Sequence, residues 1–432
     1  MLAPPPHAFR IYPPALARQI TRRARPLRPN TPRSPSTSPP TPTTASSSKS
    51  RPSTTTSLVA GRSVYADQEA SSIPLPPRPY TFHIGASWAG KPPHAKDMKK
   101  VPFPPDTLIG AWRDRTLGWK GKGSENRATQ MVVDPGEDFF FVQEVRFIKT
   151  GIPKSSSLFL PFFAESLADA SRLEGVSFGV ADGVGGWVDS GVDPALFSQA
   201  LMYHAHRYSR NAWAGEPEID PTMDYEEREQ IEGWEMTPYE CLDLAYGGVL
   251  REKYVQAGSS TACIISLNAS SGVLRSANLG DSGFLILRQT SLVHRQAPQT
   301  HFFNCPKQLT KLPTNNGRRF SRACVDSPSE AETYRAKLRD GDIVIVYTDG
   351  LADNVFQSEM MTICSLVART GGTEDEQVQA MADRLVDYAR QCMKSKSRVS
   401  PFEREASRVG MYFRGGKPDD VTVIVALVRE TS

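Results

Sequence analysis

Acids near the start, closely spaced cysteines and long apolar runs are all scarce in this 432-residue chain. The first acid is Asp67, whereas residues 1–66 carry ten Lys or Arg residues. The remaining 41 basic residues meet 47 acidic ones, so residues 67–432 have a net charge of −6. The mildly basic character of the chain therefore comes from its N-terminal segment, and we expect no nucleic acid among its partners.

The six cysteines show no CxxC spacing and lie mostly within apolar patterns. Zinc ligation is therefore disfavoured, a chain of this size needs no disulfide framework, and a reducing compartment fits. Apolar runs are short as well: Val421–Val428 is eight residues long, against the ~20 that cross a bilayer. We therefore expect no transmembrane segment.

Residues 1–79 are predicted to lie outside the folded domain. Arginine recurs without acids over residues 1–30, and Ser and Thr become frequent after it, which is typical of a mitochondrial transit peptide. Residues 29–57 form a Pro, Ser and Thr tract with too few apolar residues to bury a core. The composition predicts a transit peptide with a disordered tail, and hence a protein of the mitochondrial matrix. The alternative is a disordered basic tail without a targeting function.

Residues 80–432 are predicted to form one domain in which strands and helices are mixed. Expected strands are Phe139–Phe147, Val176–Asp182, Thr261–Leu267, Val273–Leu279, Phe284–Arg288, Ile343–Tyr347 and Val421–Val428. The three from Thr261 to Arg288 are joined by short turns and predict two hairpins, hence antiparallel pairing. Residues 289–340 are expected to be loop with a short helix at Glu330–Leu338, and residues 89–130 and 216–236 are expected to be insertions of unassigned role.

Helix starts are marked by N-cap patterns. Asp193-Pro194 combines a cap with proline at the first helical position, and capping boxes stand at Thr237–Glu240 and Thr373–Glu376. Hairpin strands interrupted by pairs of helices predict an α+β fold, with helices packed outside a sheet or a sheet sandwich. Continuously apolar strands such as Val421–Val428 must be covered on both faces.

Acids recur at strand ends and in tight turns. They are Glu137, Asp138, Asp182, Asp281, Asp349, Asp353, Asp419 and Asp420. Clustered carboxylates repel one another and burial raises their pKa values, so a cation must compensate them. Oxygen-only ligands favour Mg²⁺ or Mn²⁺ over zinc. Two such ions ~3.5–4 Å apart can activate a water for attack on phosphorus.

Five motifs in this order resemble the metal-dependent protein phosphatases (the protein phosphatase 2C family). They are Val-Ala-Asp182-Gly183-Val-Gly-Gly, Gly258-Ser-Ser-Thr261, Ala277-Asn-Leu-Gly280-Asp281-Ser282, Tyr347-Thr-Asp349-Gly350-Leu351 and Pro418-Asp419-Asp420-Val-Thr-Val. The resemblance covers roughly residues 80–430, and the segments 183–194 and 301–309 resemble the mitochondrial branch of the family. It implies a β-sandwich of two antiparallel sheets flanked by helices, a four-layer α-β-β-α arrangement, with a binuclear metal centre.

The resemblance also implies roles for the acids. Asp182 would bridge two Mg²⁺ or Mn²⁺ ions and, together with Asp138, which would hold a metal-bound water, carry the catalysis. The other implied metal ligands are Glu137, the main-chain carbonyl of Gly183, Asp349 and Asp419. A weaker third metal is implied on Asp281, Asp349 and Asp353.

The implied activity is hydrolysis of phosphoserine and phosphothreonine in mitochondrial phosphoproteins. Two departures matter: Val184 stands where many members carry a His as general acid, and Val133 where many carry a phosphate-gripping Arg. Arg127 is the candidate for phosphate. These departures keep open a pseudophosphatase that binds phosphoproteins without turnover. An aspartyl-intermediate phosphotransferase is disfavoured, because that chemistry wants a second Asp at position 184. The sequence leaves the oligomeric state and the physiological metal open.

Overall fold

A computed structural model describes residues 79–92, 101–118, 133–148, 171–210, 236–313 and 323–431. The chain divides into two compact units, Met1–Leu75 and Pro76–Ser432, and only the second contains described residues. The predicted transit peptide and tail, Arg127 and nearly all of segment 216–236 lie outside the described residues. Within the part described, no helix combines the length and apolar character needed to span a membrane.

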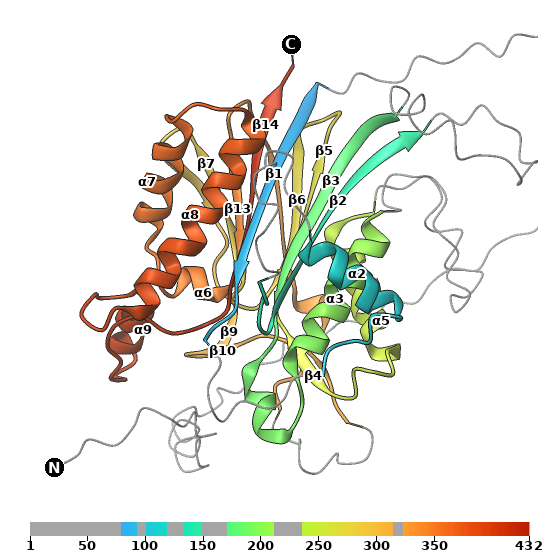
Figure 1. Ribbon diagram of the computed structural model, residues 1–432, viewed down its shortest axis with the longest axis vertical. Helices are drawn as coiled ribbons and strands as arrows, with labels where there is room; N and C mark the ends of the chain where they lie inside the picture. The colour runs from blue at the N-terminus through green and yellow to red at the C-terminus, as the bar shows by residue number, and fades with distance from the viewer. Residues whose placement is uncertain are drawn as a thin grey trace, which may run out of the picture. The chain divides into compact units, whose positions relative to one another are not determined.

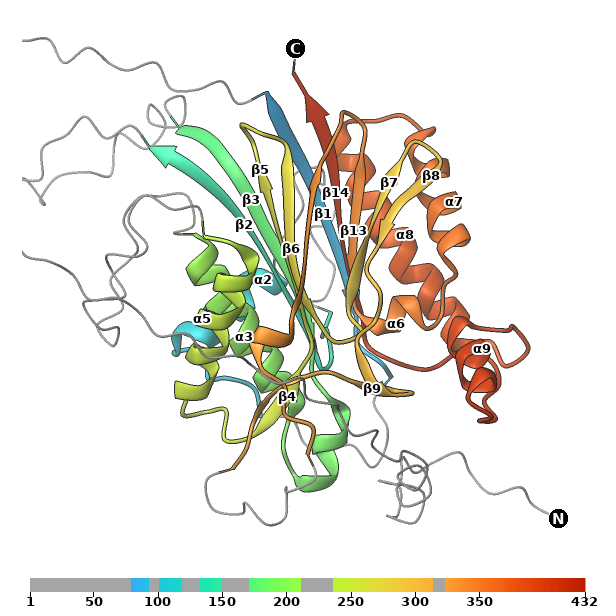
Figure 2. The same cartoon turned by 180° about the vertical axis from the view of Figure 1, so that it is seen from behind.

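Two five-stranded antiparallel sheets form the centre of the second unit (Figures 1 and 2). The first has the order β1 (Tyr80–Ala89), β14 (Val421–Glu430), β13 (Ile343–Tyr347), β7 (Gly283–Arg288) and β8 (Ser291–Arg295). The second has the order β12 (Glu332–Lys337), β6 (Val273–Leu279), β5 (Ala262–Asn268), β3 (Ser171–Asp182) and β2 (Asp138–Ile148). Two short pairs lie outside them: β4 (Gly258–Ser260) with β11 (Leu309–Lys311), and β9 (Thr300–Phe302) with β10 (Cys305–Pro306).

Helices cover the outer face of each sheet (Figure 1). On the first sheet lie α7 (Gln357–Ala368) and α8 (Glu374–Lys394), and on the second lie α2 (Leu108–Leu117), α3 (Pro194–Ser209) and α5 (Pro238–Arg251). Short elements complete the chain: α6 (Asp349–Ala352), α9 (Pro401–Arg408) and the 3-10 helices η2 (Gly185–Ser190) and η3 (Pro328–Glu330). The predicted four-layer α-β-β-α sandwich is confirmed.

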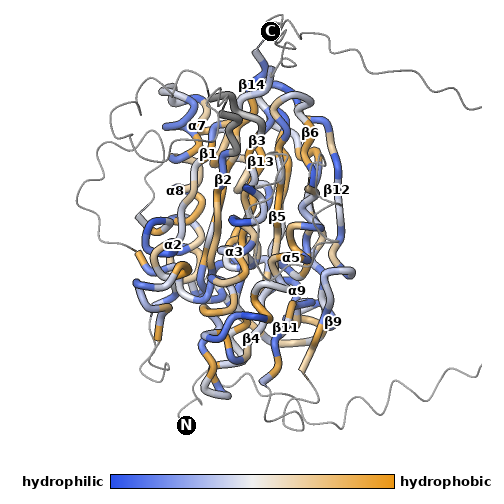
Figure 3. The backbone as a smooth tube through the Cα atoms, turned by 90° about the vertical axis from the view of Figure 1, so that its right-hand side faces the viewer, coloured by the Kyte–Doolittle hydropathy of each residue, from blue (hydrophilic) through white to orange (hydrophobic). Residues whose placement is uncertain are grey.

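Three apolar cores separate the four layers. The central core lies between the sheets and contains Phe140 and Phe178 from one side and Val344 and Ile424 from the other. The outer cores pack α3 and α5, or α7 and α8, against the sheet beside them. Both faces of the central strands are thus buried, which explains their continuous apolar sequences. Figure 3 shows hydrophobic residues concentrated along these strands.

The capping signals place the helices as predicted. Asp193 accepts a hydrogen bond from the main-chain N–H of Ala195 at the start of α3. Thr237 and Thr373 form complete capping boxes at the starts of α5 and α8. These bonds satisfy main-chain donors that would otherwise have no partner in the first turn.

One predicted hairpin is wrong. β6 pairs with β5 and β12, whereas β7 pairs with β13 and β8, so residues 280–283 carry the chain from one sheet to the other. Gly280 has φ +104°, and a Cβ there would lie 2.6 Å from Cγ2 of Thr261. The local turn chemistry is the same for a hairpin and for this crossover, so sequence could not separate them. The crossover brings Asp281 between the sheets.

Two further segments differ from expectation. The predicted helix Glu330–Leu338 is wrong, because Glu332–Lys337 is the edge strand β12, paired with β6. Its Glu, Ala and Lys residues favour helices, but pairing along an open sheet edge overrides that preference. The rest of 289–340 contributes β8, β9, β10 and β11. Segment 89–130 holds the helix α2, which begins at the N-cap Thr107 and buries Trp112.

Candidate metal centre

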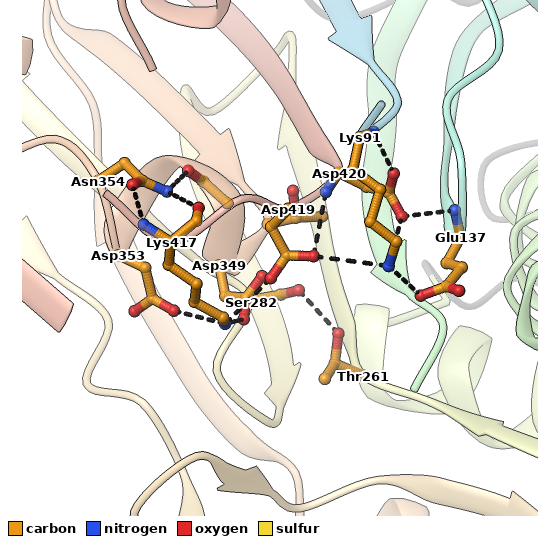
Figure 4. Close-up of polar contacts among 12 residues, drawn as sticks. Lys91, Glu137, Thr261, Ser282, Asp349, Asp353, Asn354, Lys417, Asp419 and Asp420 are labelled. Atoms are coloured by element: carbon orange, nitrogen blue, oxygen red, sulfur yellow. Dashed lines mark hydrogen bonds and ion pairs between the residues drawn. The ribbon is translucent and has the colours of Figure 1, made fainter. Parts of the chain in front are cut away.

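The acids come together because the strands that carry them end at the same place. Asp138, the first residue of β2, lies opposite Asp182, the last residue of β3. In the other sheet Ala89 at the end of β1 lies opposite Val421 at the start of β14, directly after Asp419 and Asp420. Asp349 follows the end of β13 by two residues. Figure 4 shows part of the resulting cluster, with Glu137, Asp349, Asp419 and Asp420 labelled.

Asp182, Asp281 and Asp349 form its most compact part. Each offers a carboxylate oxygen, and these three oxygens lie within 4.8 Å of one another. Burial raises the pKa of Asp182 and of Asp281 well above its ordinary value, and the nearby charge of Asp349 raises both further. Oδ1 of Asp281 is buried and has no hydrogen-bond partner among the described residues.

Glu137 and Gly183 are held side by side by the main chain. The Gly183 N–H donates to the Glu137 carbonyl at 3.1 Å, and the Ser198 hydroxyl donates to the same carbonyl at 2.6 Å. A Cβ at Gly183 would lie 2.7 Å from the Pro194 carbonyl oxygen and 2.8 Å from that of Glu137. Only glycine fits here, so the main chain at position 183 approaches the acids closely.

Asp138, the first residue of β2, is 1% exposed. The Thr348 hydroxyl donates to its Oδ2 at 2.7 Å, and Thr348 in turn accepts from the Thr422 N–H at 3.0 Å. Oδ1 of Asp138 is buried without a partner among the described residues. Burial, followed by the charge of Asp420, raises the pKa of Asp138 well above its ordinary value. This carboxylate therefore has one satisfied oxygen and one oxygen left to accept a proton or a hydrogen bond.

The two adjacent acids before β14 do different things. Asp420 is 2% exposed; its Oδ1 accepts from the Lys91 N–H at 2.6 Å and its Oδ2 from the Glu137 N–H at 2.8 Å. Asp419 faces the other acids and contacts two ammonium groups, Lys417 Nζ at 3.0 Å and Lys91 Nζ at 3.9 Å. The geometry therefore leaves Asp419, rather than Asp420, available to a metal ion.

Two lysines lie among the acids, and sequence reasoning assigned neither of them a role. Lys417 Nζ lies 2.6 Å from Asp349 Oδ2 and 2.7 Å from Asp353 Oδ2 (Figure 4). Lys91 Nζ lies 2.7 Å from Glu137 Oε2. Burial alone would lower the pKa of each lysine, but the surrounding carboxylates raise it above its ordinary value. Both side chains are therefore charged.

The signals for these lysines differ. Lys417 stands two residues before Asp419, so a cation inside an acidic motif was visible in the sequence. Lys91 follows β1 in a segment expected to be an insertion, and only the pairing of β1 with β14 brings it to the acids.

Within the part of the chain that the structure describes, the two departures, Val184 and Val133, make main-chain hydrogen bonds. Val184 donates its main-chain N–H to the Ser259 carbonyl at 3.0 Å, and the carbonyl of Val133 accepts from Trp88 Nε1 at 2.9 Å. Each of these two valines contributes a main-chain hydrogen bond, and neither side chain can serve as a general acid or a phosphate ligand.

The residues present fit divalent cations of the Mg²⁺ and Mn²⁺ kind. All the donors in the described cluster are oxygen atoms, which those ions prefer, and none is the His or Cys that zinc prefers. Buried carboxylate oxygens without partners, as at Asp138 and Asp281, are costly unless a cation or a proton compensates them. The choice between Mg²⁺ and Mn²⁺ does not follow from the donor set.

No family model matches the chain. Among solved structures, the X-ray structure of the photosystem II phosphatase PBCP is 24% identical, with a TM-score of 0.49 over 80% of this chain and 98% of that one. The catalytic domain of the serine/threonine protein phosphatase PstP, in complex with two manganese ions, is 16% identical with a TM-score of 0.34, covering 68% of this chain and 99% of that one.

Sequence relatives are more similar. The protein phosphatase PTC7 homolog fig of Drosophila willistoni is 39% identical over 251 residues, which cover 58% of this chain and 72% of that protein. The protein phosphatase PTC7 homologs of Xenopus laevis and Homo sapiens are 38% and 37% identical over 252 residues, 58% of this chain and 76% and 75% of theirs. The chain therefore belongs to the PTC7 protein phosphatases, within the metal-dependent protein phosphatase 2C family that its motifs resemble.

Proposed function

We propose that this chain hydrolyses phosphoserine and phosphothreonine in mitochondrial phosphoproteins, using two bound Mg²⁺ or Mn²⁺ ions. The observation that supports it most is the convergence of Asp182, Asp281 and Asp349, whose oxygens from three separate segments lie within 4.8 Å of one another. When bound, the two ions would supply a water of lowered pKa and neutralise charge on the phosphoryl oxygens.

The chain's own residues divide the work of holding the ions. Asp182 precedes Gly183 in the chain and has an oxygen within 4.8 Å of one of Asp349, so it would serve both ions. Asp349 and Asp419 would complete one site, and Glu137 with the carbonyl of Gly183 would complete the other. Their supports are rigid, because each lies at the end of a buried strand or in a loop fixed by main-chain hydrogen bonds.

Asp138 is proposed to position the attacking water. Its Oδ2 is occupied by the Thr348 hydroxyl, which leaves Oδ1 to accept a proton from that water. Its raised pKa favours this role, since a carboxylate in a buried, negatively charged site takes up a proton more readily than one in water.

Lys91 is proposed to contact the phosphoryl group, the role of the arginine that many family members carry where this chain has Val133. Its side chain is 34% exposed, more than those of Glu137, Asp419 and Asp420, which it contacts. The contact with Glu137 at 2.7 Å uses one of the three N–H donors of the ammonium, and the others remain for phosphate oxygens.

The test is an assay of the full chain on p-nitrophenyl phosphate and a phosphothreonine peptide, with Mn²⁺, Mg²⁺ or EDTA. Turnover is expected with metal, none in EDTA, and a loss of at least about 100-fold in Asp182→Asn. Asp340→Asn, at an exposed acid paired with Arg429, is the matched control and should keep full activity. A folded wild-type protein without turnover would instead support the phosphoprotein-binding pseudophosphatase.

Delivery to the mitochondrial matrix is part of the proposal and is tested separately. Ten basic residues without an acid over residues 1–66 support it. A reporter carrying residues 1–79 should enter isolated mitochondria and become protected from protease only when the membrane potential is intact. A reporter that stays protease-sensitive would remove the matrix assignment without affecting the phosphatase assignment.

A further inference from the structure

Lys417 is tied to α6 through both of its main-chain polar groups. Its N–H donates to Oδ1 of Asn354 at 2.9 Å, and its carbonyl accepts from Nδ2 of the same residue at 2.9 Å. Asn354 is fully buried and also donates to the Gly350 carbonyl at 2.9 Å. The Lys417 ammonium lies 5.0 Å from the centre of the Phe402 ring. The lysine is therefore fixed relative to the helix that begins with Asp349.

The ammonium of Lys417 contacts three carboxylates. It lies 2.6 Å from Asp349 Oδ2, 2.7 Å from Asp353 Oδ2 and 3.0 Å from Asp419 Oδ2 (Figure 4). Two of its three N–H donors go to Asp349 and Asp353, and the carboxylate of Asp419 lies at ion-pair distance beside them. The side chain is 11% exposed, which leaves water little part in this arrangement.

These contacts conflict with the third metal ion implied on Asp281, Asp349 and Asp353, because two of those three acids already contact the ammonium. Such an ion would need oxygens from both of these acids, and the ammonium already contacts Oδ2 of each. A metal ion bound to the same two carboxylates as the ammonium would be repelled strongly by it, because the site is buried. The ammonium leaves Oδ1 of Asp349 and of Asp419 on the side of the other acids, although Asp419 Oδ1 also accepts the Asp420 N–H at 3.0 Å. Asp353 is not among the three acids whose oxygens lie within 4.8 Å of one another.

We infer that the Lys417 ammonium is a built-in cation that takes the place of a third metal ion. The site then binds two divalent ions, and Asp353 is the partner of the lysine instead of a metal ligand. This inference rests on the proposed two-metal function, but it concerns how many ions bind and what stabilises the metal-free protein.

The test is calorimetric titration of the full chain with Mn²⁺ alone, together with melting curves in EDTA. Wild type and Asp353→Asn should each bind two Mn²⁺ ions. Lys417→Met should bind three, and its metal-free melting temperature should fall by about 5 °C or more, since three carboxylates lose their counter-ion. Lys417→Arg keeps the charge and should bind two. Lys307→Met, which breaks an ion pair with Glu330 elsewhere, should match wild type in stoichiometry.

Three Mn²⁺ ions on wild type, with one lost in Asp353→Asn, would overturn the inference, because Asp353 would then be a metal ligand. A metal-free Lys417→Met that melts with wild type would overturn it too. If Lys417→Met does not fold, the comparison of wild type with Asp353→Asn decides. If wild type binds no Mn²⁺ at all, the proposed function fails, and the metal-free melting curves of Lys417→Met and Lys417→Arg still decide the role of the lysine.

Discussion

Replacing the neighbouring acids Asp419 and Asp420 one at a time by asparagine should give opposite results. Asp420 accepts main-chain hydrogen bonds from Lys91 and Glu137 at 2.6 and 2.8 Å and is 2% exposed. Asp419 has no such main-chain partners from other segments and contacts the ammonium groups of Lys417 and Lys91. We expect Asp420→Asn to destabilise the fold and Asp419→Asn to weaken metal binding.

The magnitudes follow from these contacts. Asp420→Asn keeps one acceptor oxygen but turns an NH₂ group toward the other main-chain donor. A hydrogen bond to a charged group contributes about 1.5–3 kcal/mol, and leaving a buried donor unpaired costs about 1–3 kcal/mol. The free energy of unfolding should therefore fall by about 2–4 kcal/mol, which for a domain of this size lowers the melting temperature by roughly 3–5 °C.

Asp419→Asn should change the metal-free protein much less. It removes one contact to Lys417 but also one of several carboxylates that repel one another. The expected change is within about 1 kcal/mol. Its effect is on metal affinity, and a tenfold loss removes about 1.4 kcal/mol of the stabilisation that Mn²⁺ provides at saturation.

Differential scanning calorimetry in EDTA and in Mn²⁺ measures both effects on the same samples. Asp420→Asn should have a lowered melting temperature in EDTA yet keep most of the rise in melting temperature that Mn²⁺ produces. Asp419→Asn should melt with wild type in EDTA and lose much of that increase. The reverse pattern would show that Asp420 is the metal ligand and would refute the assignment drawn from the main-chain contacts.

Three further outcomes are expected. Burial raises the pKa of Asp353 from 3.8 to about 7 and raises that of Asp138 as well, so the folded metal-free protein binds more protons than the unfolded chain. The stabilisation by these protons is complete below pH 3.8 and is lost as pH rises through about 7. The melting temperature in EDTA should therefore fall between pH 5.5 and 8, and it should fall less steeply with pH in Asp353→Asn. Lys91→Met should raise KM for phosphothreonine peptide by about tenfold or more and leave kcat less affected, whereas Lys91→Arg should recover most of the loss; equal KM values would remove Lys91 from phosphate binding. Gly183→Ala should destabilise the fold by about 2 kcal/mol or more, since its Cβ would lie under 3 Å from two carbonyl oxygens; an unchanged melting temperature would show that the loop can move.

Single strands and helix starts were predicted well because they depend on local patterns, whereas the four-layer arrangement was implied by the family resemblance. The strand Ile343–Tyr347 was predicted with its observed bounds, since its apolar run ends sharply before Thr348-Asp349-Gly350. The capping boxes at Thr237 and Thr373 placed two helices for the same reason. An acid that directly follows an apolar strand must lie where that strand ends, whatever the order of the strands in the sheet.

Features that depend on sheet order escaped the sequence. The turn at residues 280–283 has the same glycines whether β7 returns beside β6 or joins the other sheet, and only the paired strands decide. Lys91 meets Asp419 and Asp420 because β1 pairs with β14 along its whole length. The edge strand β12 has helix-forming residues, and its strand conformation comes from its neighbour β6.

The charges at the site limit how many ions it can take. Within the described residues the connected carboxylates are Glu137, Asp138, Asp182, Asp281, Asp349, Asp353, Asp419 and Asp420. Against these eight stand two ammonium groups, so full ionisation would leave six negative charges in a mostly buried site, which burial opposes. The metal-free protein must therefore hold protons there, and metal uptake below neutral pH must release them. Two divalent ions cancel four of the six charges, and protons held by the buried carboxylates can cancel the other two. With Lys417 in place a third divalent ion would have to enter beside a fixed ammonium, whereas without Lys417 the same carboxylates need another cation or another proton.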